Sequence, residues 1–284
     1  MKERKHKILN HPILGYFLLM LFALIITQVI SAIIDNMILA RFISGYAFTQ
    51  TIAGTERSQA TGVGTAAGAV LSIGLFYLWF RPSFDGMLKK RDLLKGLMLL
   101  APILIIHWIG SIVSIVQFGT ASVLIAFLRS FAPGFGEETA FRGLGVANYL
   151  RRNPTEKGVV VILWLSSIVF GVVHVANAIG GAPLSISIGQ AAYAAGIGMV
   201  LGAVYLRTGN LWPSILGHMS VDFLELIRSD LGSTGGVVSG IGAGDWITIN
   251  AGAAGIFWGL YLVRPAKRSE IVELWKSKWS FKTE

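Results

Sequence analysis

The sequence predicts an all-α, polytopic membrane protein of about eight transmembrane helices that enclose a polar intramembrane cavity. Apolar residues make up 54% of the 284 positions, charged residues only 14%, and the mean hydropathy is +0.65, well above that of an average soluble domain. Apolar runs near ~20 residues, the length that crosses ~30 Å of hydrocarbon, recur along the chain. They lie roughly at 13–34, 61–80, 94–116, 121–150, 159–179, 188–206, 211–228 and 246–263.

The first apolar run follows a basic start and is a candidate signal peptide. It is longer than a signal sequence and no small-residue cleavage pattern follows it, so we interpret it as a retained helix. Small residues inside the runs, such as Gly198 and Gly202, allow close helix packing. Because the chain has no cysteine, disulfides, thiolate catalysis and cysteine-bound metals are excluded.

The basic residues indicate topology. The net charge is +9, but Lys and Arg gather in short clusters at helix ends, which argues against nucleic acid as a partner. The clusters lie at 2–7, 81–91 and 151–157, at Arg207 and after Arg264, whereas the alternate loops 35–59 and 229–245 are poor in them. Eight crossings with both termini cytoplasmic satisfy this pattern. We therefore expect a multi-pass protein of the plasma membrane, in contact with membrane lipid.

The chain has no internal repeat and no second domain. We expect one transmembrane domain over 1–263 and a cytoplasmic, basic, amphipathic tail over 264–284. In the tail, Ile271, Leu274, Trp275 and Trp279 recur at helical spacing with lysines between them, as in an interfacial helix. A helix that binds a soluble partner is the alternative.

The fourth segment, 121–150, is too long for a simple crossing. Pro133, Gly134 and Gly136 interrupt it just before two glutamates and Arg142. Helices that break within a membrane usually line a cavity. The sequence therefore predicts that this segment lines the polar cavity.

Ionisable residues within the apolar runs are functional candidates, because an unpaired charge in hydrocarbon is costly. Glu138 precedes Arg142 by four residues, the favourable order for an ion pair within one helix, which leaves Glu137 without a partner there. His218 and Asp222 are also four apart and share one helix face.

Depth supports one shared site. Counted from the basic loops at ~1.5 Å per residue, Glu137, His174 and His218 all fall near the middle of the bilayer. His107, alone in the third segment, is interpreted as structural. His6 and His11 belong to the exposed amino-terminal region.

Three motifs in order resemble a known family, the CPBP membrane endopeptidases, which comprise CAAX proteases and bacteriocin-processing enzymes and include the type II CAAX prenyl endopeptidases. The family pattern is Glu-Glu-x-x-x-Arg, then Phe-x-x-x-His, then His-x-x-x-Asn or Asp, on separate helices. The matching residues, within a core of 134–227, are Glu137, Glu138 and Arg142, then Phe170 and His174, then His218 and Asp222. Members that process prenylated proteins tend to carry Asn where this chain has Asp222.

The resemblance implies a glutamic intramembrane endopeptidase that acts on a membrane-associated peptide or a lipid-modified protein. Glu137 would be the general base, aided by His174, while His218 and Asp222 would stabilise the oxyanion or help to bind a metal. The neighbouring Glu138, Arg142 and Phe170 would support the site. We expect no obligatory cofactor, with a zinc site formed by Glu137, His174 and His218 as the alternative mechanism.

The motifs of other intramembrane proteases are absent or incomplete in this chain. The chain has no His-Glu-x-x-His motif of the site-2 metalloproteases and no Gly-x-Ser-Gly motif of the rhomboid type. A Gly-x-Gly-Asp match at 242–245 lacks the second aspartate of presenilin-like proteases and falls in a predicted external loop. The alternative functions are a non-catalytic scaffold or immunity-type protein of the same fold, and a proton-coupled transporter.

Overall fold

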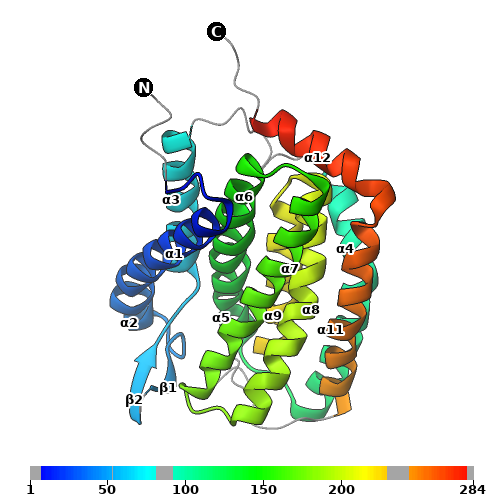
Figure 1. The fold of residues 1–284 in the computed structure, drawn as a ribbon. Helices are drawn as coiled ribbons and strands as arrows, with labels where there is room; N and C mark the ends of the chain where they lie inside the picture. Colours follow the sequence, from blue (N-terminus) through cyan, green and yellow to red (C-terminus); the bar gives the residue numbers. More distant parts are fainter. Residues whose placement is uncertain (1–7, 53, 81–91, 229–242, 280–284) are drawn as a thin grey trace.

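The chain folds into a bundle of long helices with one short β-hairpin at one end (Figure 1). This computed structural model describes residues 8–52, 54–80, 92–228 and 243–279. The start of the first helix and the last helix, α12 (Pro265–Trp279), lie at the end of the bundle opposite the hairpin. The long helices are α1 (Pro12–Ser31), α3 (Val63–Phe80), α4 (Leu93–Phe118), α7 (Glu156–Val173), α8 (Leu184–Thr208), α9 (Trp212–Leu226) and α11 (Ala243–Leu262).

The all-α membrane class is confirmed, but the number of crossings is not fixed at eight. All eight predicted segments are helical. Within the described residues, five helical stretches are long and apolar enough to span a membrane, and the bent pair of α11 and α12 would give a sixth. The fourth segment is divided among several helical stretches, and α9 has only 15 residues. The predicted basic clusters at 2–7 and 81–91, and residues 229–242, lie outside the described residues.

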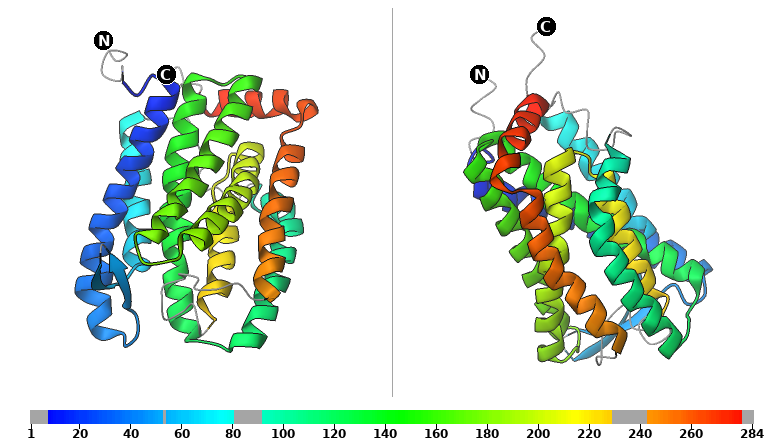
Figure 2. Two further views of the ribbon diagram at one scale, coloured as in Figure 1. Left: turned by 60° about the horizontal axis from the view of Figure 1, so that its bottom comes forward. Right: turned by 90° about the vertical axis from the view of Figure 1, so that its right-hand side faces the viewer.

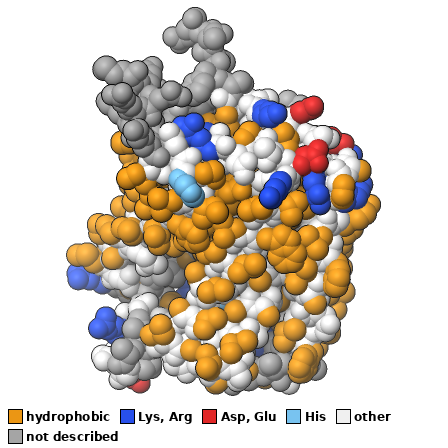
Figure 3. Space-filling model, in the orientation of Figure 1, with side chains coloured by type: hydrophobic (Ala, Val, Ile, Leu, Met, Phe, Trp, Pro, Cys, Tyr) orange, Lys and Arg blue, Asp and Glu red, His pale blue; other side chains and the backbone are white. Residues whose placement is uncertain are grey.

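The sides of the bundle are covered with apolar side chains. In Figure 3 hydrophobic groups dominate the visible flank, whereas charged groups gather mainly at the end that carries α12. Val116, Leu78 and Phe257 are each more than 70% exposed. An apolar surface this extensive fits contact with lipid. Long helices suit that environment, because their backbone N–H and C=O groups are hydrogen-bonded to one another within the helix.

The fourth segment continues as a helix where the sequence predicted a break. It runs through α5 (Val123–Phe131), η3 (Ala132–Glu137), η4 (Thr139–Val146) and α6 (Ala147–Arg152), and both η stretches are π-helical. Pro133 contributes no backbone N–H, and π-helical turns recur at functional sites. A Cβ on Gly134 would lie 2.1 Å from Met219 Cγ, and one on Gly136 2.5 Å from Thr65 Cγ2. The glycines therefore allow α9 and α3 to pack closely on this wide helix.

The first helix extends past its predicted end. The predicted loop boundary at Asp35 is wrong, because α1 continues through η2 (Ala32–Leu39) and α2 (Ala40–Phe42). The hairpin follows, with β1 (Phe48–Ile52) antiparallel to β2 (Thr55–Gln59). Asp35 is fully buried and accepts hydrogen bonds from the N–H groups of Gly62, Gly64 and Thr65 at the start of α3. These orphan donors of a helix N-terminus need an acceptor, which explains the buried carboxylate.

The tail helix α12 packs against the protein with its apolar face. It bends 74° away from α11 and crosses the end of the bundle (Figure 2). Trp275 is fully buried, and its indole N–H donates to the carbonyl of Leu206 at 3.0 Å. Ile271 is buried beside it. Two of the four aromatic and aliphatic residues predicted to contact lipid therefore contact helix ends instead.

Small residues set the position of α8. A Cβ on Gly202 would lie 3.1 Å from Leu163 of α7, and one on Gly196 would collide with the backbone of Gly252 in α11. A Cβ on Gly198 would lie 2.8 Å from Arg142 Nη2 and 3.0 Å from Phe170 Cδ1. The close approach predicted for Gly198 and Gly202 is thus directed at α7, and it brings Phe170 toward the interior of the bundle.

Candidate active site within the helix bundle

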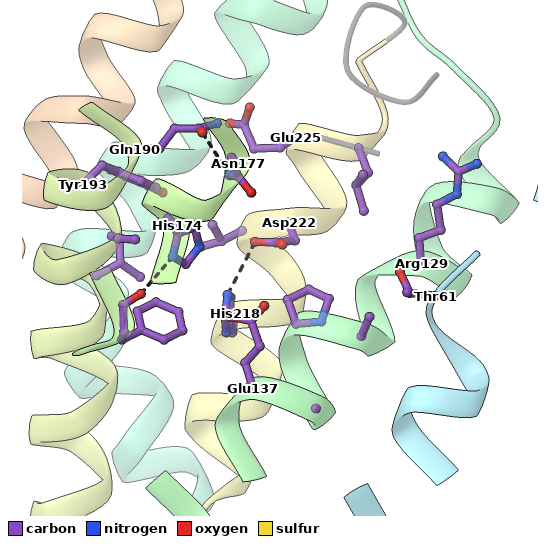
Figure 4. Close-up of a pocket in the computed structure, with 18 of the residues that line it drawn as sticks. Thr61, Arg129, Glu137, His174, Asn177, Gln190, Tyr193, His218, Asp222 and Glu225 are labelled. Carbon is purple, nitrogen blue, oxygen red and sulfur yellow. Dashed lines mark hydrogen bonds and ion pairs between the residues drawn. The ribbon is translucent and has the colours of Figure 1, made fainter. Parts of the chain in front are cut away.

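A cavity of about 430 Å³ lies among η3, η5, α8 and α9 and reaches toward α1 and the hairpin. Its lining includes all four residues predicted to be catalytic, and Figure 4 shows them on facing helices. These are Glu137, His174, His218 and Asp222. The structure therefore brings together the three motifs, which are more than 80 positions apart in sequence at their extremes.

Glu137 is the last residue of the first π-helical stretch, η3. It lines the cavity, and its Oε2 atom is buried without a hydrogen-bond partner among the described residues. Buried carboxylate oxygens in folded proteins normally have a partner, so each exception requires an explanation. An oxygen kept unpaired beside a cavity can accept a hydrogen bond from a water molecule or a substrate.

His174 opens η5 (His174–Ala178), the short 3₁₀ turn at the end of α7. Its Nδ1 lies 2.8 Å from the carbonyl oxygen of Phe170. A carbonyl can only accept, so Nδ1 carries the proton, and Nε2 of the neutral ring keeps a lone pair. The Phe170 ring meets the imidazoles of His174 and His218 edge to face, at 5.1 and 5.5 Å. The Phe-x-x-x-His spacing thus fixes both the tautomer and the position of His174.

Glu138 joins two of the motifs through one oxygen. Its Oε1 accepts from Arg142 Nη1 at 2.8 Å, the ion pair expected from the sequence, and from His218 Nδ1 at 2.9 Å. Glu138 and Arg142 are fully buried. Arg142 also donates to the carbonyl of Gly198 at 3.2 Å, and its guanidinium lies 4.2 Å over the Phe170 ring. Glu138 and Arg142 therefore lie behind the cavity and hold its walls together.

Asp222 faces the other nitrogen of His218. The distance from His218 Nε2 to Asp222 Oδ1 is 3.6 Å, beyond a normal hydrogen bond. The direct hydrogen bond to this imidazole comes from Glu138, at Nδ1. That contact joins α9 to the fourth segment across 80 positions of sequence, so helical spacing could not reveal it.

The cavity also contains polar residues that lie outside the three motifs. Gln190 and Tyr193 of α8 lie one turn apart on the face that carries Ile197, and Asn177 donates to Gln190 at 3.1 Å. Glu225 of α9 lines the same space. Polar residues at i and i+3 within the apolar run of α8 were the available signal.

Within the described residues, no three His, Asp or Glu side chains converge in an arrangement that could hold a metal ion. The side chains of the alternative zinc set, Glu137, His174 and His218, therefore do not converge on one point in this structure.

The fold and this cluster define a polytopic membrane protein with an ionisable site inside its helix bundle. Residues 118–224 match the model of the type II CAAX prenyl endopeptidase Rce1-like family. The match includes every motif residue from Glu137 to Asp222 and confirms the resemblance predicted from the sequence. No curated protein and no solved structure gives a significant match to the chain.

Proposed function

We propose that the protein is an intramembrane endopeptidase that hydrolyses a peptide bond with water activated by Glu137 and His174. The observation that carries the proposal is the unpaired carboxylate oxygen of Glu137 in the cavity that His174 also lines. The similarity of residues 118–224 to Rce1-like endopeptidases supports the same reaction class.

The proposed reaction uses groups of this chain alone. Glu137 removes a proton from a water molecule that also donates to the Nε2 lone pair of His174, and the water oxygen attacks the scissile carbonyl carbon. His218 and Asp222 lie on the oxyanion side, where a proton on Nε2 of His218 would stabilise the developing charge. The intermediate collapses when the carbon–nitrogen bond breaks, and the proton on Glu137 passes to the leaving amine.

The same residues could instead require a metal. We favour hydrolysis without one, because Glu137, His174 and His218 do not form a group that could hold a metal ion in the described part of the chain, and Glu137 is then available as the base. Activity of the purified enzyme after exhaustive chelation, with elemental analysis of the same sample, tests this. Full loss of activity that one equivalent of zinc restores would overturn the metal-free assignment.

The decisive experiment is cleavage of a peptide library, with and without lipid modification, by purified protein in detergent, read by mass spectrometry. Wild type should cleave a subset of peptides, and Glu137→Gln should cleave none. Glu270→Gln is a matched control, because this carboxylate lies on α12 with 54% of its side chain exposed. A scaffold predicts that Glu137→Gln leaves the cellular phenotype intact, and a transporter predicts substrate-linked proton movement in vesicles.

We further propose that both termini face the cytoplasm and that the protein lies in the plasma membrane with its substrate. The cysteine-free chain allows a direct test with an impermeant thiol reagent. Glu56→Cys on the hairpin should react from outside intact cells, whereas Lys157→Cys at the opposite end should react only after permeabilisation. Labelling of Lys157→Cys in intact cells would show that the protein has the opposite orientation in the membrane.

A further inference from the structure

A polar network outside the motif residues adjoins the cavity. At its centre is His107 of α4, which is fully buried. Its Nδ1 lies 2.7 Å from the hydroxyl of Tyr193, and its Nε2 lies 3.1 Å from the hydroxyl of Ser111 and 3.4 Å from the carbonyl of Val221. Ser111 in turn donates to Glu225 Oε1 at 2.9 Å. The network joins α4, α8 and α9 and has more contacts than the isolated structural histidine that the sequence suggested.

The direction of each hydrogen bond follows from two groups that can only accept, the Glu225 carboxylate and the carbonyl of Val221. The single hydroxyl proton of Ser111 is bonded to the Glu225 carboxylate, so the Ser111 oxygen accepts from His107 Nε2. The carbonyl of Val221 also requires a proton on Nε2. Nδ1 of the neutral ring is then an acceptor, and Tyr193 donates its proton to it. The Tyr193 oxygen can offer only lone pairs to the cavity that it lines.

We propose that Tyr193 is a substrate-binding residue that accepts a hydrogen bond from a main-chain N–H of the peptide, with His107 as its positioning residue; this inference depends on the proposed endopeptidase function. Both ends of the network, Tyr193 and Glu225, line the cavity that holds Glu137 and His174. An extended peptide there would present its N–H groups to the wall formed by α8 and α9.

A neutral donor fits this wall better than a cationic side chain. Glu225 Oε2 is paired with Arg228 at 3.2 Å, and Oε1 accepts from Ser111. The carboxylate charge is therefore already balanced, and the phenol of Tyr193 carries none. A lone-pair acceptor without net charge matches an amide N–H.

The test pairs a protein variant with a substrate variant. In peptides that wild type cleaves, each non-scissile amide is replaced in turn by an ester, which removes one N–H. We expect one position at which the ester raises KM about tenfold with kcat unchanged, as the loss of a single hydrogen bond predicts. Tyr193→Phe should raise KM for the amide peptide by a similar factor and should make the enzyme indifferent to the ester at that position.

His107→Leu should reproduce the effect of Tyr193→Phe, because the phenol proton then turns toward the cavity, whereas His107→Gln should restore part of the affinity. Tyr261→Phe, on an exposed tyrosine of α11, is the matched control. If Tyr193→Phe keeps wild-type KM and ester sensitivity at every position, the inference is wrong while the endopeptidase proposal stands. If wild type cleaves no peptide, both fail together.

Discussion

Two carboxylates within this bundle differ in how their oxygens are used. Asp35 accepts five hydrogen bonds, from the hydroxyls of Ser31 and Tyr46 and from three backbone N–H groups at the start of α3. Glu137 lies on η3, which packs against the same helix α3, and keeps Oε2 without a partner among the described residues. Both side chains belong to helices that pass through the same apolar bundle.

Under the proposed function, this difference separates a structural carboxylate from a reactive one that lines the cavity. At Asp35, the free-energy cost of removing the carboxylate from water is offset by the hydrogen-bond donors that surround it. At Glu137 that compensation is incomplete, so the oxygen retains its capacity to bind water or a proton. We expect substitutions at the first site to change stability and substitutions at the second to change turnover.

The largest effect is expected for Glu137→Gln. Loss of the general base should lower kcat by up to about 10⁴-fold, because proton removal from the attacking water then has no acceptor. The melting temperature should stay close to that of wild type, since no hydrogen bond to Oε2 is lost. Turnover by mass spectrometry and unfolding in detergent on the same preparation would reveal whether the two quantities separate. A clearly lower melting temperature for Glu137→Gln would show that Glu137, like Asp35, has a structural role.

Glu138→Ala should behave in the opposite way from its neighbour. It leaves Arg142 and His218 without their shared acceptor in a fully buried site, and breaking such a pair costs about 3–5 kcal/mol of stability. Protein yield and melting temperature should both fall, together with activity. Equal expression and equal melting temperature for Glu137→Gln and Glu138→Ala would refute the division of roles between the two glutamates.

His218→Ala tests the oxyanion side of the site. It removes the imidazole between Glu138 and Asp222, so we expect a loss of about 3 kcal/mol in transition-state stabilisation, mainly in kcat. His218→Asn, which retains one donor, should recover part of the rate. A change confined to KM would instead assign His218 to substrate binding.

The smallest of these effects is expected at Asp35. Asp35→Asn presents an amide to donors that need an acceptor, so stability should fall by about 2 kcal/mol while kcat of the folded protein is unchanged. Thermal unfolding of the variant, with kcat corrected for the folded fraction, measures both. A loss of turnover as large as that of Glu137→Gln would show that the two carboxylates do not differ in role.

The sequence could predict whatever depends on neighbours along one helix. Apolar runs located the helices, and i, i+4 spacing identified the Glu138 and Arg142 pair. Contacts across the bundle were not accessible in this way. Glu138 meets His218 across 80 positions, and the backbone donors to Asp35 lie 27 to 30 residues further on, in the next predicted transmembrane segment.

Packing also decided what the apolar faces contact. The spacing of Ile271 and Trp275 is the same for a helix on lipid and for a helix on protein, so only the structure places them against the helix ends. His107 shows the same limit, because its partners Tyr193 and Val221 come from two other helices.

The size of the cavity has a consequence for how the site is solvated. At about 30 Å³ per molecule, 430 Å³ has room for on the order of ten waters. A hydrolytic centre in this bundle therefore need not draw its nucleophile one molecule at a time through hydrocarbon. It can hold several water molecules in this pocket at the same time, and each turnover would consume one of them.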